Sequence, residues 1–275
     1  MRNILVPIDF SKKSEFAIQI AAKIHKINNC QIYLLYTVEL PAGQKDMSSR
    51  TRFSIPESMM YLRILRKKMG AIKEDFFPKN DSIHCAIKAK NPFEGIIDYS
   101  KRIDADLIIM GSKGISNFDK LIAGSNADRV LIKSEIPVLV VKENARKFKL
   151  KKIVFASNFK EENKAVFDKF LAFVKEFKTE IVLLKIITKS KFEPFYETKQ
   201  QISNFISDFN MPKHTIQIYN DTTVENGILN FSREIKADLI ALSTHGRSGL
   251  SYLFNGSIAG SVTKKGLSPI ITFKI

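Results

Sequence analysis

One stretch of this chain occurs twice: ADLIIMGSKG at residues 105–114 returns as ADLIALSTHG at residues 237–246. A second pair follows the same order, with NILVPIDF at residues 3–10 and KIVFASNF at residues 152–159. The chain has 275 residues, a length expected of two ordinary domains. We therefore interpret it as two copies of one unit in tandem.

The repeat also predicts where the two domains begin and end. We expect a first domain at residues 1–142, a polar and basic linker at residues 143–151, and a second domain at residues 152–275. The repeated pairs are 149 and 132 residues apart, so the first copy holds 17 additional residues. We place them in residues 39–57, which lack periodicity and are rich in Ser and Pro. A connection of this length is either a functional lid or a passive insertion.

Short apolar runs alternate with helical patterns in both copies. Residues 4–8 form a continuous apolar run, which is typical of a strand covered on both faces. Ser11 fits the N-cap of the helix that follows, whose apolar residues recur at helical spacing. We expect strands at residues 4–8, 31–38, 82–89, 105–110, 138–141, 152–157, 180–187, 214–219, 237–242 and 270–274, and helices at residues 11–28, 58–77, 92–103, 125–133, 161–177, 194–209, 224–235 and 257–265.

This strict alternation predicts an α/β fold with two tandem, doubly wound parallel sheets. Each sheet is expected to have five strands in the order 3-2-1-4-5, as in Rossmann-like or flavodoxin-like domains. The last strand of each copy would otherwise leave an exposed edge, and exposed edges invite aggregation. We therefore expect residues 137–141 to pair with residues 270–273, so that the two halves pack as a pseudo-dimer.

The chain is basic, with a formal net charge of +16 at pH 7, and 34 of its 44 basic residues are Lys. These lysines are scattered singly or in short clusters along the sequence. Proteins that read nucleic acids usually rely on Arg for bidentate contacts. We interpret the charge as a solvated surface, and we expect no nucleic-acid partner.

Other features bear on the cellular compartment. No apolar run is long enough to span a bilayer, and the first residues do not resemble a signal peptide. Only two cysteines are present, Cys30 and Cys85, so we expect no disulfide framework. Both fall on predicted strands, where we expect buried, inert thiols. These features indicate a reduced, cytoplasmic protein without a membrane partner.

Glycines mark the end of the fourth predicted strand. Gly111 and Gly114 follow that strand, and after nine more residues Gly124 and Ser125 begin the next predicted helix. Glycine lets a ligand approach the backbone closely, and free amides at a helix N-terminus favour an anion. This set is either a phosphate site or a pair of ordinary turns with a glycine cap. It matches neither a Walker A loop nor the G-x-G-x-x-G pattern.

The first predicted strand lies beside the fourth in the expected sheet order. Pro7 and Asp9 therefore share an edge with Gly111, and ligands of such sheets bind at this edge. Asp9 has two interpretations. It either bonds a ribose hydroxyl or approaches a phosphate-bound Mg²⁺ through water, or it is an N-cap or turn residue before the next helix.

Three features together resemble the universal stress protein family: PIDFS at residues 7–11, the pattern G-2x-G-9x-G-S at residues 111–125, and PVLVV at residues 137–141. In that family the glycine pattern is the ATP-binding signature of the nucleotide-binding branch, and the first copy matches it completely. The second copy, with THGRSG at residues 244–249 and NGS at residues 255–257, is also similar. The resemblance covers essentially the whole chain as a tandem of two such domains.

The resemblance implies the ligand residues of the first copy. The adenine would lie near Pro7 and the backbone of Thr37, with Asp9 facing the ribose and Met110 and Gly111 lining the floor. The phosphates would be surrounded by Gly114, Gly124, Ser125 and Asn126, with Lys113 close to them. Two residues depart from the family pattern: Thr37 stands where an apolar residue is common, and Lys113 where His is frequent.

The second copy departs further from the family pattern. Ala156, Asn158 and Ser243 replace Pro7, Asp9 and Gly111. Its Gly246, Gly256 and Ser257 remain, so an anion site could survive there while the ribose contact weakens. We expect the second copy to be degenerate.

The resemblance implies a protein that binds ATP or a related adenine nucleotide, with or without Mg²⁺, and regulates or senses stress. Nothing in the sequence positions a water or a strong base, so we expect no enzyme activity beyond slow ATP hydrolysis. The four His residues have no metal-ligand spacing, and no Ser-His-Asp set is evident. The alternative is a protein-interaction or small-molecule-binding module without nucleotide. Either function leaves room for a protein partner and for a homodimer.

Overall fold

The computed structural model describes residues 1–38, 55–78, 80–111, 126–141, 148–244, 262–263 and 268–275. Strands and helices alternate along its first half, as predicted. Their bounds are β1 Asn3–Ile8, α1 Lys12–Asn28, β2 Gln31–Val38, α2 Ile55–Phe76, β3 Ile83–Ala89, α3 Pro92–Arg102, β4 Leu107–Gly111, α4 Asn126–Lys133 and β5 Val138–Val141. Ser11 is the N-cap of α1, because its side chain accepts a hydrogen bond from the Ser14 amide.

The second half repeats this alternation. Its elements are β6 Lys152–Ala156, α5 Lys164–Val174, β7 Glu180–Ile187, α6 Phe195–Ile206, β8 His214–Asn220, α7 Val224–Glu234, β9 Leu239–Thr244 and β10 Ile270–Lys274. A short 3₁₀ turn, Glu161–Asn163, precedes α5. The helix expected at residues 257–265 falls almost entirely outside the described residues.

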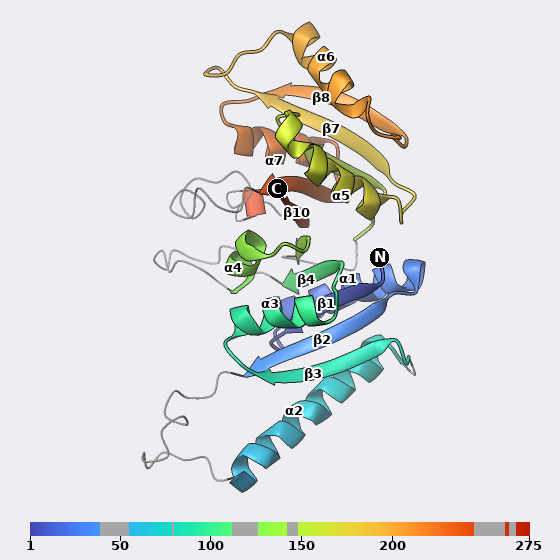
Figure 1. Ribbon diagram of the computed structural model, residues 1–275, viewed down its shortest axis with the longest axis vertical. Coiled ribbons are helices and arrows are strands. Elements are labelled where there is room, and N and C mark those ends of the chain that lie inside the picture. Colours follow the sequence, from blue (N-terminus) through green and yellow to red (C-terminus); the bar gives the residue numbers. More distant parts are fainter. Residues whose placement is uncertain (39–54, 79, 112–125, 142–147, 245–261, 264–267) are drawn as a thin grey trace.

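All ten strands form one sheet in the order β3-β2-β1-β4-β5-β10-β9-β6-β7-β8. Each half keeps the predicted order 3-2-1-4-5, with parallel pairing inside it. At the junction, β5 and β10 pair antiparallel, with Ile271 opposite Leu139. The predicted edge-to-edge pairing is therefore confirmed, and the two expected sheets are one continuous sheet. Figure 1 shows the halves end to end, with the outer strands β3 and β8 far apart.

Two layers of helices cover the sheet, because alternate residues of each strand point to opposite faces. On one face, α1, α2, α5 and α6 cover a single cluster that runs through both halves and includes Ile20, Phe167 and Phe273. On the other face, α3 and α4 cover a cluster in the first half that includes Leu5 and Met110. Helix α7 covers a separate cluster in the second half.

The repeat is visible in the backbone as well as in the sequence. The Asp106 carboxylate accepts hydrogen bonds from the amides of Arg2 and Asn3 at the start of β1. Asp238 does the same for Lys151 and Lys152 at the start of β6. Each of these carboxylates ties the turn before the fourth strand of its half to the first strand.

Left-handed residues recur at matching positions, and one of them gives a stability prediction. Lys236 follows α7 with a φ of 54°, where a side chain costs about 1 kcal/mol relative to glycine. We expect Lys236→Gly to raise the free energy of unfolding by about 1 kcal/mol in urea denaturation. Lys175, at the end of α5, has a right-handed φ of −54°. The control Lys175→Gly should instead lower stability, and equal effects of the two changes would contradict this account.

The structure corrects the placement of the 17 additional residues. They were all expected in the connection at residues 39–57, but α2 has 22 residues where α6 has 12. Much of the extra length therefore extends a helix. Residues 39–54 themselves lie outside the described part of the chain.

The prediction for the two cysteines is half right. Cys30 is buried, and burial raises the pKa of its thiol to about 11. Cys85 is exposed, so the expectation of a second buried thiol is wrong. The reason is that β3 is an outer strand of the sheet, paired only with β2.

Candidate functional site

Four of the predicted site residues lie at one edge of the first half, where parallel strands end. Pro7 is near the end of β1, Thr37 near the end of β2, and Met110 and Gly111 at the end of β4. Strand alternation places Pro7 on the same face as Leu5, and Thr37 on the same face as Leu35. Leu5, Leu35 and Met110 all belong to the cluster under α3 and α4. The three adenine-side residues therefore share the face on which α4 begins.

At Gly111, the backbone of β4 packs very closely against the backbone of α1. A Cβ atom built on Gly111 would lie 2.4 Å from the Lys13 carbonyl oxygen and 2.9 Å from the Ser14 nitrogen. These are backbone atoms of the first turn of α1, which cannot move aside as a side chain could. Glycine at this position allows β4 and α1 to pack closely beside the end of β1.

Asp9 lies just beyond β1 and is exposed. One of its carboxylate oxygens accepts a hydrogen bond of 3.0 Å from the Ser11 amide, so Asp9 has the turn role that was one of its two interpretations. Partial burial raises the pKa of Asp9, but hydrogen bonds from Ser11 and Ser14 outweigh this effect and lower the pKa overall. Asp9 is therefore a carboxylate at neutral pH. The ribose contact stays a prediction.

The remaining predicted residues divide into two groups. Asn126 is the first residue of α4 and is exposed at its N-terminus. The rest lie outside the described residues: Lys113, Gly114, Gly124, Ser125, Gly246, Gly256 and Ser257. Their contribution to a phosphate site stays a prediction from the glycine pattern.

Sequence reasoning missed one residue of the site, Gly95 in α3. A Cβ atom on Gly95 would lie 2.8 Å from the Thr37 Cγ2 atom, so α3 passes directly over the end of β2. The second half repeats this contact, because a Cβ on Gly227 would lie 2.7 Å from Ile186. The signal was available, since Gly95 and Gly227 are 132 residues apart, the spacing of the repeated fourth strands.

A cavity of about 230 Å³ is lined in part by Gly95. Three cationic side chains and one carboxylate lie around it: Lys88, Lys90, Arg102 and Asp98. Lys90 and Asp98 form an ion pair across it. This ion pair partly neutralises the positive charge next to the candidate site.

Comparison with known proteins identifies the family. The family described as the universal stress protein family matches residues 1–142, which is just over half of the chain. The chain belongs to the universal stress protein family. A universal stress protein of Methanocaldococcus jannaschii is 29% identical over 149 residues, covering 52% of this chain and 82% of the relative. The stress response protein NhaX of Bacillus subtilis is 27% identical over 160 residues, covering 50% of this chain and 96% of the relative.

Solved structures show the same fold over both halves of this universal stress protein. The crystal structure of a universal stress protein from Archaeoglobus fulgidus has a TM-score of 0.74, covering 99% of this chain and 96% of that one at 20% identity. A functionally unknown protein from Pseudomonas aeruginosa has a TM-score of 0.69, covering 100% and 92% at 16% identity. The tandem architecture is therefore shared with other chains of similar length.

The second half of this universal stress protein has a different arrangement at the matching edge. Asn158, which replaces Asp9, has a neutral amide, although its side-chain oxygen accepts hydrogen bonds from Lys160 and Asn163 at the positions that match Ser11 and Ser14. Ser243 replaces Gly111. The first helix also begins later, at Lys164 after the 3₁₀ turn, where α1 begins at Lys12. The second half therefore has a Cβ at the position that matches Gly111, and its first helix starts about one turn later in the chain.

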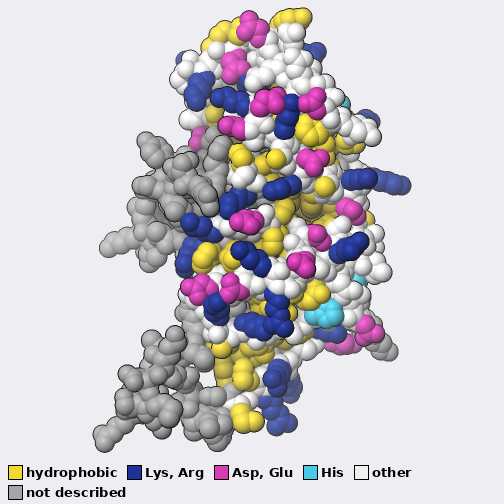
Figure 2. Space-filling model, viewed as in Figure 1, with side chains coloured by type: hydrophobic (Ala, Val, Ile, Leu, Met, Phe, Trp, Pro, Cys, Tyr) yellow, Lys and Arg dark blue, Asp and Glu magenta, His cyan; other side chains and the backbone are white. Residues whose placement is uncertain are grey.

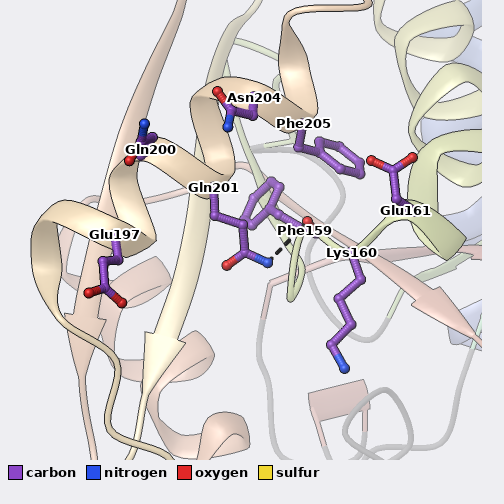
Figure 3. Close-up of a pocket in the computed structure, with 8 residues that line it drawn as sticks. All are labelled: Phe159, Lys160, Glu161, Glu197, Gln200, Gln201, Asn204 and Phe205. Atoms are coloured by element: carbon purple, nitrogen blue, oxygen red, sulfur yellow. Dashed lines mark hydrogen bonds between the residues drawn. The ribbon is translucent and has the colours of Figure 1, made fainter.

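A cavity of about 570 Å³ lies in the second half, but on the opposite face of the sheet. Figure 3 shows it between the turn after β6 and helix α6, lined by Phe159, Lys160, Glu161, Glu197, Gln200, Gln201, Asn204 and Phe205. The Gln201 side chain donates to the backbone oxygens of Asn158 and Phe159. This cavity is therefore a groove closed by α6, and it is separate from the predicted nucleotide edge.

In the part of the chain that the structure describes, no group of three or more His, Cys, Asp or Glu could hold a metal ion. Among these same residues, no helix combines the length and apolar character needed to cross a bilayer.

Proposed function

We propose that this universal stress protein binds ATP or a related adenine nucleotide in its first half, with or without Mg²⁺, and acts as a regulator or sensor in the stress response. One observation carries the proposal. The glycine pattern of residues 111–125 joins the end of β4 to the start of α4, at the edge where Pro7, Thr37 and Met110 share a face. A helix that begins beside such a loop favours an anionic group.

Different described residues would contact the adenine, the ribose and the phosphates of the nucleotide. Thr37 is partly exposed, and the buried Pro7 and Met110 would form the apolar floor beneath an adenine ring. Asp9 is exposed in the turn between β1 and α1, where its carboxylate would accept hydrogen bonds from ribose hydroxyls. The triphosphate would extend toward the N-terminus of α4, where Asn126 is exposed. No described group in this arrangement acts as a strong base on water, so the protein would hold the nucleotide rather than turn it over.

The second half serves as the natural comparison for the first. Asn158 has a neutral amide where the first half has the Asp9 carboxylate, and Ser243 occupies the place of the glycine at the end of the fourth strand. Both features weaken the case for a nucleotide there. The proposal therefore gives one binding site per chain, in the first half.

Paired glycine variants test this assignment. Gly95→Ala would push Thr37 toward the adenine position, and we expect it to weaken ATP binding about tenfold, a loss of about 1.4 kcal/mol. Gly227→Ala makes the equivalent change beside Ile186 and should leave ATP binding unchanged. Calorimetric titration with ATP and Mg²⁺ measures both. Equal affinities for the wild type and Gly95→Ala, or a loss that appears only in Gly227→Ala, would contradict the placement of the site.

Asp9→Asn gives an independent test of the ribose contact. The change keeps the Ser11 hydrogen bond possible, so the fold should be retained, but it removes the charge that a pair of ribose hydroxyls would favour. We expect ATP to bind about five- to tenfold more weakly, in the range of one charge-assisted hydrogen bond. A wild type that shows no heat with ATP would instead favour an interaction module that binds no nucleotide.

A further inference from the structure

Three large aromatic side chains are exposed together where β7 leads into α6. Phe192 is 78% exposed, Phe195 is 65% exposed and Tyr196 is 76% exposed. They fall within five consecutive residues: Phe192 lies in the connection, and Phe195 and Tyr196 begin α6. This connection projects at the end of the molecule where α6 lies (Figure 1). Figure 2 shows hydrophobic side chains at this same end. We call residues 189–196 the aromatic tip.

The aromatic tip is held firmly although it is exposed. Thr188 and Lys191 form an isolated antiparallel bridge, and the hydroxyls of Thr188 and Ser190 are 3.2 Å apart. Inside the protein, the buried Lys185 side chain pairs with the Glu193 carboxylate and donates a hydrogen bond of 2.6 Å to Gln201. The tip is therefore fixed to β7 and α6 on both sides, and its aromatic rings are presented without a large entropic cost of ordering.

Positive charge surrounds these rings. Lys189, Lys191 and Lys199 are exposed around them, and Glu193, one of two nearby carboxylates, is neutralised by Lys185. Residues 185–199 hold four Lys and two Glu, a net charge of +2. Exposed aromatic rings with lysines close by in the sequence suit an interface in which an anionic layer covers apolar groups.

We propose that the aromatic tip docks on anionic lipid surfaces, with Phe192, Phe195 and Tyr196 entering the headgroup region and the lysines contacting lipid phosphates. The charge of the chain, +16, opposes pairing of two lysine-bearing tips from two copies. A single-stranded nucleic acid would be expected to lie in a positively charged groove, whereas this tip projects and contains no Arg. The expectation of no membrane partner rested on the lack of a long apolar run in the sequence, and that criterion does not reveal which aromatic residues are exposed.

The absence of Trp from the chain allows a direct measurement at the tip. Phe195→Trp introduces a single tryptophan there, and Met60→Trp introduces one at an exposed position of α2 in the other half. Vesicles of phosphatidylcholine, alone or mixed with phosphatidylglycerol, are then added to each variant. We expect a blue shift of the emission only for Phe195→Trp and only with phosphatidylglycerol. No shift, or an equal shift at both positions, would overturn the proposal.

Vesicle co-sedimentation of the full chain separates the tip from the overall charge. Combining Phe192→Ser, Phe195→Ser and Tyr196→Ser should weaken binding to phosphatidylglycerol vesicles about tenfold or more. Combining Met59→Ser, Met60→Ser and Ile64→Ser removes exposed apolar groups from α2 and should have little effect. Because all six side chains are exposed, none of these changes should affect folding, which thermal unfolding checks.

A charge-matched pair completes the test. Lys189→Glu with Lys191→Glu should weaken vesicle binding, whereas Lys175→Glu with Lys178→Glu makes the same change in charge elsewhere and should not. An equal loss in both pairs would mean attraction by net charge alone and would overturn the proposal. So would binding of oligo(dT) rather than vesicles at the tip, or concentration-dependent self-association that the aromatic substitutions abolish.

Discussion

Gly111→Ser is expected to lower the free energy of unfolding by about 3 kcal/mol and to abolish detectable ATP binding. A Cβ atom at this position would lie 2.4 Å from a backbone oxygen of α1, so either β4 or the first turn of α1 must move. Both elements border the candidate site, and Asp9 is held by hydrogen bonds to that same turn. Urea denaturation measures the first effect and calorimetric titration the second.

Ser243→Gly is the matched control for this substitution. It places in the second half the residue that the first half has, and Ser243 is partly exposed. The change should cost at most about 1 kcal/mol, from the greater freedom of glycine in the unfolded chain. If Gly111→Ser were tolerated as well as Ser243→Gly, the close approach of α1 would not explain the glycine.

Ile271→Asp is expected to lower the free energy of unfolding by about 4 kcal/mol or more. Ile271 is fully buried in β10, opposite Leu139 at the antiparallel junction of the two halves. A carboxyl group there has no polar partner among the described residues. It must therefore either be buried without a hydrogen-bond partner or separate β10 from β5. Because this junction is the continuous link between the two halves of the sheet, we also expect limited proteolysis to cut the variant between them.

Ile275→Asp makes the same change four residues later in the chain. Ile275 is 40% exposed, and its amide keeps the hydrogen bond to Thr244. Its cost should stay within about 0.5 kcal/mol, as for most surface substitutions. Similar losses for both variants would mean that the junction adds little to stability.

Most of the fold could be predicted because the repeat and the periodicity agree with each other. The strand order and the β5–β10 pairing are confirmed, since each follows from general rules for parallel sheets and exposed edges. The start of α2 could not be predicted in the same way, because the helix expected at residues 58–77 begins at Ile55. Its exposed face carries apolar residues such as Met60 and Ile64, so hydrophobic pattern alone does not mark where a helix begins.

The candidate site was predicted less completely than the fold. Pro7, Thr37 and Met110 were assigned by resemblance, and the structure brings them to one edge and one face. Gly95 was missed because its role depends on how closely α3 passes over β2, a distance that a single sequence does not contain. Outside the candidate site, the role of Lys185 in β7 was missed for a similar reason. It lies in an apolar strand, and its partner Glu193 belongs to the following connection.

The two halves differ at the turn between the first strand and the first helix. In the first half, glycine at the end of the fourth strand lets α1 begin at Lys12 beside an ionised Asp9. In the second half, Ser243 and the neutral Asn158 accompany a later helix start. One nucleotide per chain is the stoichiometry that this difference predicts.

Mass spectrometry of the purified protein after acid denaturation tests the central proposal most directly. The supernatant would contain any small molecule that was bound during expression. We predict an adenine nucleotide at up to one equivalent per chain, and much less of it from Asp9→Asn prepared in parallel. A protein that releases no nucleotide, and that shows no heat when titrated with ATP and Mg²⁺, would contradict a nucleotide site in the first half.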